Sequence, residues 1–253
     1  MNSIFSFHRI KLLAIRYYFE LGRRDLFTMC AFFIAFVLLP HIVNDASNTF
    51  NPVLFGIILF IGGMRFTARI FHEIHQPAPG MHYLHIPASR LEKYLFNGML
   101  TLILYPAICL LLYYGGVYFG NLLEPIIPSF FNYRIIDIST LIPGIYVKKI
   151  ASQYVIMHAI FFLGSLSFKK HPTTKTFLSI ITFAIGVGII QAILTGMLWS
   201  NIDVHSIDFL NNKVGQLIIS WPRIEPYLNN VLGGIIVMFF WTVSYLKLKE
   251  KQV

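Results

Sequence analysis

The chain has 253 residues, of which 56% are hydrophobic and only 12% are charged. A soluble domain carries about 25% charged residues, so this composition excludes an ordinary soluble protein. The formal net charge is +9, but the basic residues stand at the ends of long apolar runs. That placement indicates contact with membrane lipid headgroups and argues against nucleic acid. We therefore expect an integral membrane protein built as a single helical bundle.

Residues 1–25 are expected to form a cytoplasmic amphipathic helix. Apolar residues recur there at steps of three and four, so they share one helical face; they are Phe7, Ile10, Ala14, Tyr17 and Leu21. This pattern predicts an interfacial helix on the cytoplasmic leaflet, with Arg9, Arg16, Tyr17 and Arg23 at the membrane surface. An ordinary cytosolic helix is the alternative. Because charges are interleaved with apolar residues, the segment does not read as a signal peptide.

Six apolar runs follow, each close to the roughly 20 residues that a helix needs to cross a bilayer core of about 30 Å. They are Leu26–Val43, Pro52–Phe71, Tyr94–Phe119, Ile150–Phe168, Thr176–Trp199 and Val231–Leu248. The predicted fold class is therefore an all-α membrane protein with six transmembrane helices, in a domain that covers 26–248. The third run contains Pro106, so we expect it to kink or tilt. The fourth is the weakest, because Gln153 and His158 lie inside it.

The distribution of Lys and Arg predicts the orientation of the bundle. Fifteen of these residues lie before the first run, in the second or fourth connection or its flanks (counting Arg65 and Arg69 at the end of the second run), or at the C-terminal end from Lys247 onward. Only five lie in the remaining connections. Since basic loops stay in the cytoplasm, both termini are expected there, including a short tail at 249–253.

The two connections on the opposite side are long and contain prolines. They cover Asn121–Lys149 and Asn201–Asn230 and keep apolar residues such as Ile126 and Leu217, so we expect short helices that pack back onto the bundle. Glycines in or beside the runs are expected to let neighbouring helices approach closely. These glycines are Gly62, Gly63, Gly186, Gly188, Gly233 and Gly234.

Four histidines stand in the connection Phe71–Lys93: His72, His75, His82 and His85. Their two H-x-x-H pairs bear some likeness to the histidine boxes of membrane di-iron enzymes, and imidazole suits iron and zinc. Those boxes, however, use wider spacings, adjacent His-His pairs and more ligands. The stretch His72–His75 is also one residue short of H-E-x-x-H. We therefore favour a polar interfacial loop, with a di-iron or zinc enzyme as the alternative.

Familiar catalytic motifs are missing from the sequence. There is no Walker-type G-x-x-x-x-G-K-[ST] loop and no G-x-S-x-G elbow. None of the six runs contains an acidic residue, although transporters coupled to protons or sodium often keep a carboxylate in the membrane. We expect no catalytic centre and no cofactor in this chain. If it transports a substrate, the energy should come from another protein.

Two stretches resemble a known family. Ile86–Leu95, with the sequence I-P-A-S-R-L-E-K-Y-L, is similar to the L-P-A-S-x-x-E-K-[FY]-L segment of ABC type-2 transporter permease subunits from Bacteroidetes-like bacteria. Leu163–Lys170, continuing to Lys175 and Thr176, is similar to the G-S-x-x-F-K-K-x-x-x-x-K-T segment of those chains. The two stretches cover under a tenth of the sequence, and the six-run layout extends the resemblance to nearly all of it.

The resemblance implies the membrane subunit of an ATP-driven exporter in the bacterial cytoplasmic (inner) membrane. In that family an amphipathic helix precedes six spans, and a re-entrant segment, here near Leu217–Trp221, precedes the last one. The connection between the second and third spans docks into a separate ABC ATPase subunit, which would bind ATP and Mg. The other implied partners are a second permease copy or a paralogue, and membrane lipids.

The implied coupling element contains His75, Pro87, Ala88, Ser89, Arg90, Glu92 and Lys93. We expect Pro87 to open a helix in its first turn and Arg90, Glu92 and Lys93 to offer their charges to the soluble partner. The alternative is that Ser89–Lys93 only caps the third span. A third candidate function is a membrane scaffold subunit that transports nothing.

Overall fold

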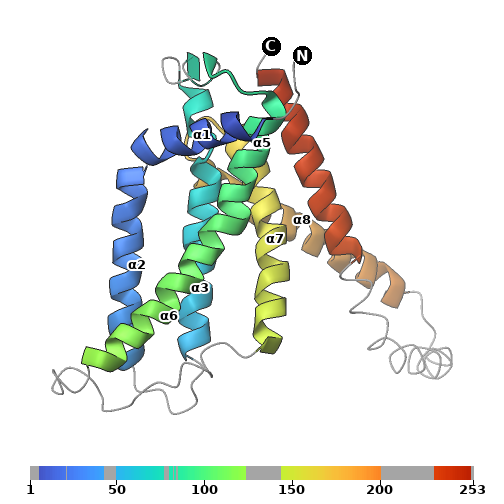
Figure 1. The fold of residues 1–253 in the computed structure, drawn as a ribbon. Coiled ribbons are helices and arrows are strands. Elements are labelled where there is room, and N and C mark those ends of the chain that lie inside the picture. Colours follow the sequence, from blue (N-terminus) through green and yellow to red (C-terminus); the bar gives the residue numbers. More distant parts are fainter. Residues whose placement is uncertain are drawn as a thin grey trace.

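The computed structural model describes residues 6–20, 22–42, 50–76, 80, 81, 83, 85–123, 144–200 and 231–251. Within these ranges the regular elements are helices (Figure 1). They are α1 (Phe7–Glu20), α2 (Gly22–Ile42), α3 (Phe50–Arg69), η1 (His72–His75), α5 (Arg90–Met99), η2 (Leu100–Leu104), α6 (Tyr105–Leu123), α7 (Gly144–Ser167), α8 (Pro172–Ser200) and a C-terminal helix (Val231–Lys251). The predicted all-α class is confirmed.

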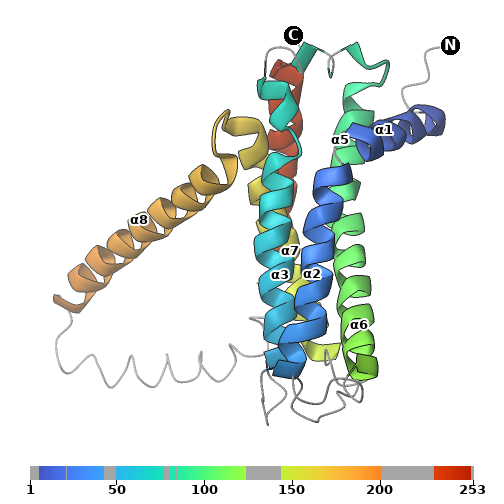
Figure 2. The ribbon, with the colours of Figure 1, turned by 90° about the vertical axis from the view of Figure 1, so that its left-hand side faces the viewer.

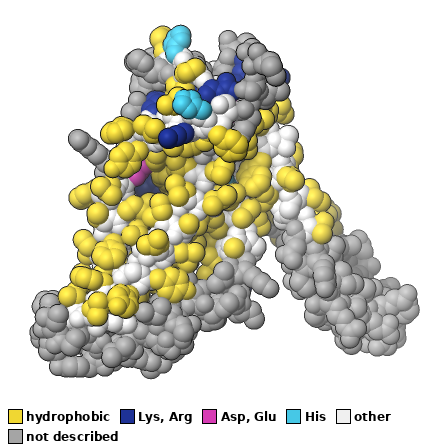
Figure 3. Space-filling model, in the orientation of Figure 1, with side chains coloured by type: hydrophobic (Ala, Val, Ile, Leu, Met, Phe, Trp, Pro, Cys, Tyr) yellow, Lys and Arg dark blue, Asp and Glu magenta, His cyan; other side chains and the backbone are white. Residues whose placement is uncertain are grey.

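Five of the helical segments are long and apolar enough to cross a membrane. They are Pro52–Arg69, Arg90–Leu123, Lys149–Ser167, Pro172–Met197 and Val231–Lys251. The first predicted run lies in α2, whose apolar stretch Asp25–Pro40 is shorter. Hydrophobic side chains cover the height of the bundle, whereas Lys, Arg and His side chains gather toward one end of the face in Figure 3. The protein is therefore built as a helical membrane protein.

The helices form a bundle that is closed at one end by a transverse helix. α2, α3, α6 and α7 run along the bundle, and α1 lies across the end where the C-terminal helix also finishes (Figures 1 and 2). We call this the α1 end. α8 diverges from the others in Figure 2, and none of its residues from 177 to 197 is buried against the described part of the chain.

Several predicted boundaries move. The third span begins with α5 at Arg90 rather than Tyr94, because Ser89 caps the helix there. α7 begins at Gly144 rather than Ile150, so the predicted connection Asn121–Lys149 is shorter by that part. The remainder of this connection (124–143), the connection Asn201–Asn230 and the predicted re-entrant segment Leu217–Trp221 lie outside the described residues.

Aromatic side chains dominate the core between α2, α3, α6 and α7. The ring of Tyr113 on α6 lies 5.0 Å from that of Phe36 and 5.1 Å from that of Phe55, and such ring pairs stabilise beyond their area burial. The complete buried cluster is Phe36, Leu54, Phe55, Ile58, Leu59, Tyr105, Cys109, Tyr113, Val117 and Tyr154. Because helix association in lipid depends on packing, this cluster holds the four helices together.

The long helix α5–η2–α6 contains a π-helical turn at Leu100–Leu104, directly before Pro106. Proline lacks an amide hydrogen and its ring clashes with the carbonyl four residues earlier. The helix adapts by widening: the Tyr105 amide donates to the Leu100 carbonyl, five residues back. The expected irregularity near Pro106 is therefore a π-helical turn, upstream of the proline.

Two polar residues of α7 contact this π-helical turn. The Tyr154 hydroxyl donates to the Thr101 carbonyl at 2.8 Å, and His158 Nε2 lies 2.7 Å from the Thr101 hydroxyl. His158 is buried, and its ring stacks on Phe162. His158, one of the two polar residues of the fourth run, thus has a partner for its Nε2 atom that fixes α7 against the turn, whereas its buried Nδ1 atom has no hydrogen-bond partner among the described residues.

The glycines confirm close packing at some sites and not at others. A Cβ on Gly63 would lie 2.7 Å from a ring carbon of Tyr154, so α3 and α7 touch there. A Cβ on Gly186, Gly188 or Gly234 would meet no atom within 4 Å. Gly116 on α6 is the tightest case against a neighbouring main chain, because its Cβ would lie 3.1 Å from the carbonyl carbon of Phe36.

Substituting Gly116→Ala should therefore push α6 away from α2 and lower the free energy of unfolding by about 1–3 kcal/mol. Gly115→Ala is the matched control, since its Cβ would meet only a ring carbon of Phe33 at 3.9 Å. The control should be neutral or stabilising by up to about 1 kcal/mol, because alanine favours a helix. Thermal unfolding in detergent compares the two, and equal stabilities would contradict the close α2–α6 contact.

Candidate functional site

Polar residues from four parts of the chain meet at the α1 end. They come from α1, η1, the segment before α5 and the first two turns of α5. The set is Arg9, Arg16, Glu73, Tyr83, Glu92, Lys93 and Asn97, which we call the α1-end cluster. The apolar bundle lies on one side of it, so its charges are partly or fully removed from water.

The start of α5 is a capping box. The Glu92 amide donates to the Ser89 hydroxyl at 3.1 Å, and the Ser89 amide donates to the Glu92 carboxylate at 2.6 Å. This reciprocal pair satisfies two amides that a helix start would leave open. Pro87 is exposed and lies two residues before the cap, so the expectation that it opens the helix is wrong. The alternative prediction, that Ser89–Lys93 caps the third span, is correct as a description of the geometry.

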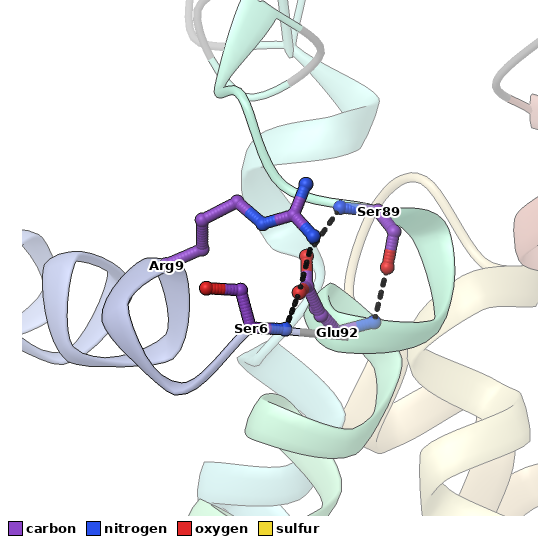
Figure 4. A network of polar contacts seen from close by, with 4 residues as sticks. All are labelled: Ser6, Arg9, Ser89 and Glu92. Carbon is purple, nitrogen blue, oxygen red and sulfur yellow. Dashed lines mark hydrogen bonds and ion pairs between the residues drawn. The ribbon is translucent and has the colours of Figure 1, made fainter. Parts of the chain in front are cut away.

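The capping carboxylate of Glu92 also binds α1. Its Oε1 atom accepts from the Ser6 amide at 2.6 Å and lies 3.0 Å from the guanidinium of Arg9 (Figure 4). The Glu92 side chain is fully buried, whereas that of Arg9 is 31% exposed. A buried carboxylate is stable only when it is paired and hydrogen-bonded, so docking of α1 and burial of Glu92 depend on each other.

Tyr83 lies at the centre of the other half of the cluster. Its carbonyl accepts from the Lys93 ammonium at 2.7 Å, and its hydroxyl accepts from the Asn97 amide at 3.1 Å. Arg16 of α1 pairs with Glu73 of η1 at 3.0 Å and lies over the Tyr83 ring. Burial raises the pKa of the Tyr83 phenol, so this group stays neutral at physiological pH. These contacts join α1, η1 and α5 around one buried aromatic residue.

A second group of contacts joins η1 to the ends of α7 and the C-terminal helix. His75 Nε2 lies 2.9 Å from the Ser165 carbonyl and donates to it, which leaves Nδ1 to accept from Lys251 at 3.0 Å. Lys247 donates to the Ser167 hydroxyl at 3.0 Å. Both lysines lie at the carboxyl end of α7, where its dipole favours cations. The connection 70–89 is therefore bound to α1 and α5 by the α1-end cluster and to α7 and the C-terminal helix by this second group.

The predicted coupling residues separate into different environments. Ser89, Glu92 and Lys93 belong to the capping box or the α1-end cluster, and His75 belongs to the second group. Ala88 lies in the bend before α5, and Arg90 is the first residue of that helix. Glu92 and Lys93 are buried, so their charges act inside the protein and are not offered to a soluble partner.

α1 docks on the bundle partly through residues that were expected at the membrane surface. Arg9 and Arg16 turn toward the protein because two carboxylates meet them there. Tyr17 also faces inward and donates to Asp25, while Phe7 of the predicted apolar stripe is 80% exposed. The outward face carries exposed apolar residues, namely Leu12, Ile15, Tyr18 and Phe19. The Arg23 side chain lies outside the described part of the structure.

Sequence reasoning missed three members of the cluster: Glu73, Tyr83 and Asn97. Lys93 and Asn97 are four residues apart and so share a helix face, a signal that was present in the sequence. Glu73 and Tyr83 carried no such signal, because their helical segments are short and their partners are distant along the chain.

The described histidines of the connection, His72, His75 and His85, do not come together as a metal site. His72 contacts Gln76, and His75 contacts Ser165 and Lys251, while His82 lies outside the described residues. In the part of the chain that the structure describes, no group of three or more His, Cys, Asp or Glu side chains could hold a metal ion.

Comparison with family models, with curated proteins and with solved structures finds no match to this chain.

The substitution Glu92→Gln should release α1. It removes the charge that pairs with Arg9 and weakens the bonds from the Ser6 and Ser89 amides. We expect a loss of about 2–3 kcal/mol in the free energy of unfolding. Lys11→Gln is the matched control, because Lys11 is exposed on the other side of α1 and should change stability by less than about 0.5 kcal/mol. Equal thermal unfolding of the two variants would refute the buried pair.

The contact between His75 and Lys251 predicts a pH dependence of stability. Burial is the main cause that lowers the pKa of His75 from its ordinary value, and the nearby Lys251 adds to it. The unfolded chain therefore binds a proton first, so the stabilising contribution is complete above about pH 6.5 and is lost as the pH falls below it. Thermal unfolding between pH 7.5 and 5.5 should show this loss in the wild type. His75→Asn should remove it, whereas His8→Asn, at an exposed site on α1, should keep it.

Proposed function

We propose that this chain is the permease subunit of an ATP-driven ABC exporter, driven by a separate ATPase subunit. It would lie in the bacterial cytoplasmic membrane with six spans and both termini in the cytoplasm, so that the α1 end faces the cytoplasm. The proposal rests on the resemblance of Ile86–Leu95 and Leu163–Thr176 to type-2 permeases. The contacts at the α1 end add a mechanical argument for it.

The proposal counts α2 as the first span, which makes six together with the five membrane-length helices. This helix has 21 residues, which corresponds to about 32 Å at 1.5 Å per residue. A bilayer core is about 30 Å thick, so the full helix is long enough even though its apolar stretch Asp25–Pro40 is short. The arginines at its start, Arg23 and Arg24, would then lie among the cytoplasmic headgroups.

The observation that carries the proposal is how firmly the connection 70–89 is tied to the rest of the bundle. Glu73 binds α1, Tyr83 binds α5, and His75 binds α7 and the C-terminal helix. A push on this connection would reach all four elements, because buried polar networks and packed cores do not deform continuously. That is the property which a coupling element needs.

The surface offered to the ATPase would differ from the one expected from sequence. Glu92 and Lys93 are buried, so contact would fall on the exposed residues of the connection: His72, Gln76, Met81, His85 and Pro87. Met81 is 64% exposed, and a methionine suits an adaptable apolar contact.

A second permease copy, or a paralogue, completes the proposed transporter. α8 supports this part of the proposal, because none of its residues from 177 to 197 is buried within the described part of the chain. Lipid or a second bundle must cover that apolar surface in the membrane. The path for the substrate would then form between the two bundles.

The direct test is purification of the tagged chain from its own host membranes in mild detergent. We expect an ATPase with a Walker motif to co-purify and to hydrolyse ATP. Met81→Asp should lower the amount of this ATPase about tenfold, while Lys11→Gln should leave it unchanged.

Two results would contradict the proposal: no ATPase with the wild-type chain, or an ATPase whose recovery is equal for both variants. A scaffold that transports nothing would retain the ATPase, but its ATP hydrolysis in reconstituted vesicles would not respond to any added substrate.

A further inference from the structure

A small cavity opens within the α1-end cluster. Its volume is about 30 Å³, and it is partly open to the surface. Leu13, Arg16 and Tyr17 of α1 line one side, and Lys93, Phe96 and Asn97 of α5 line another. Ile70, Glu73 and Tyr83 complete the wall. A volume of this size holds one or two water-sized groups, far less than the roughly 300–1,000 Å³ of a drug or cofactor site.

The cavity has a net positive lining. It contains two cationic groups, Arg16 and Lys93, against one carboxylate, Glu73. The two cations lie over the same aromatic ring: Arg16 is 5.9 Å and Lys93 is 5.0 Å from the centroid of Tyr83. Like charges held this close repel, and more strongly where little water screens them. An anionic group placed between them would relieve that repulsion.

The neutral polar groups of the wall add hydrogen-bonding capacity. The Asn97 amide and the Tyr83 hydroxyl lie together in the lining, 3.1 Å apart. An amide carries two donor hydrogens, so Asn97 can bind Tyr83 with one and an anion with the other. Two cations and an amide suit the oxygens of a phosphate group, which accepts several charge-assisted bonds at once.

The apolar part of the wall places the cavity at the boundary between membrane and water. Leu13, Ile70 and Phe96 line the cavity together with the charged groups, and α1 lies across the end of an apolar bundle (Figure 1). Basic pockets between membrane helices on the cytoplasmic side bind lipid headgroups. An occupant with a phosphate in the cavity and acyl chains along the bundle would match both halves of the wall.

We propose that this cavity binds the phosphate group of an anionic phospholipid, with Arg16 and Lys93 as its cationic ligands and Asn97 as a donor. The same chemistry would accept free phosphate, which the test below separates from lipid. The proposal does not depend on the exporter assignment. It implies that an anionic headgroup braces α1 against η1 and α5, the three elements that line the cavity.

The experiment uses the full chain in dodecyl maltoside. Dioctanoyl phosphatidylglycerol, dioctanoyl phosphatidylcholine and inorganic phosphate are titrated separately, with binding followed by native mass spectrometry and by the thermal unfolding midpoint. We expect phosphatidylglycerol to bind and stabilise, and phosphatidylcholine, which has no net charge, to bind about tenfold more weakly. Stabilisation by millimolar inorganic phosphate alone would identify free phosphate as the source of the anion.

Variants locate the site. Arg16→Gln and Lys93→Met should each weaken phosphatidylglycerol binding about tenfold, whereas Lys11→Gln removes a charge from the exposed side of the same helix and should not. If Lys93→Met fails to fold, Arg16→Gln carries the test, since the Arg16 side chain is 23% exposed.

Two outcomes would overturn the proposal. One is equal binding of phosphatidylglycerol and phosphatidylcholine together with no effect of phosphate. The other is a loss of binding in Lys11→Gln as large as that in Arg16→Gln, which would indicate a general attraction of the basic surface for anions.

Discussion

Burial of the Glu92 carboxylate is the constraint on which the rest of the α1 end depends. The group is fully buried at the start of a helix that continues for over thirty residues, from Arg90 to Leu123. It can stay ionised there only because amides of Ser89 and Ser6 and the guanidinium of Arg9 surround it. One carboxylate thus sets where α5 begins and where α1 lies.

The membrane-embedded half follows a different rule. Aromatic packing and close glycine contacts hold α2, α3, α6 and α7 together, and polar residues such as Tyr154 and Thr101 add hydrogen bonds between helices. The π-helical turn before Pro106 is an example, since the Thr101 carbonyl in this turn accepts a hydrogen bond from Tyr154 of α7 and so links the two helices. The helix α5–η2–α6 begins at the α1 end and contains this turn. A movement that starts at the α1 end would therefore be transmitted along the helix to the turn.

The apolar runs placed the five membrane-length helices of the described residues to within a few residues, because hydrophobicity over some twenty residues is a local signal. The pairing of Arg9 with Glu92 could not be predicted, since the partners are far apart in the chain and each pattern was consistent with a solvent-facing charge. The face through which α1 docks could not be predicted for the same reason: periodicity divides a helix into faces, but only tertiary partners such as Glu73 and Glu92 decide which face docks. Tyr83 lies in a short helical stretch before α5, where a periodic pattern cannot identify the buried face.

The account claims that α1, η1 and α5 form one body held by buried charges. Hydrogen–deuterium exchange of the full chain in nanodiscs, compared between the wild type and Glu92→Gln, measures this directly. Loss of one carboxylate should speed amide exchange together in α1, in η1 and in the first turn of α5, while α3 and α6 stay protected. Faster exchange confined to the first turn of α5, with α1 unchanged, would contradict the account.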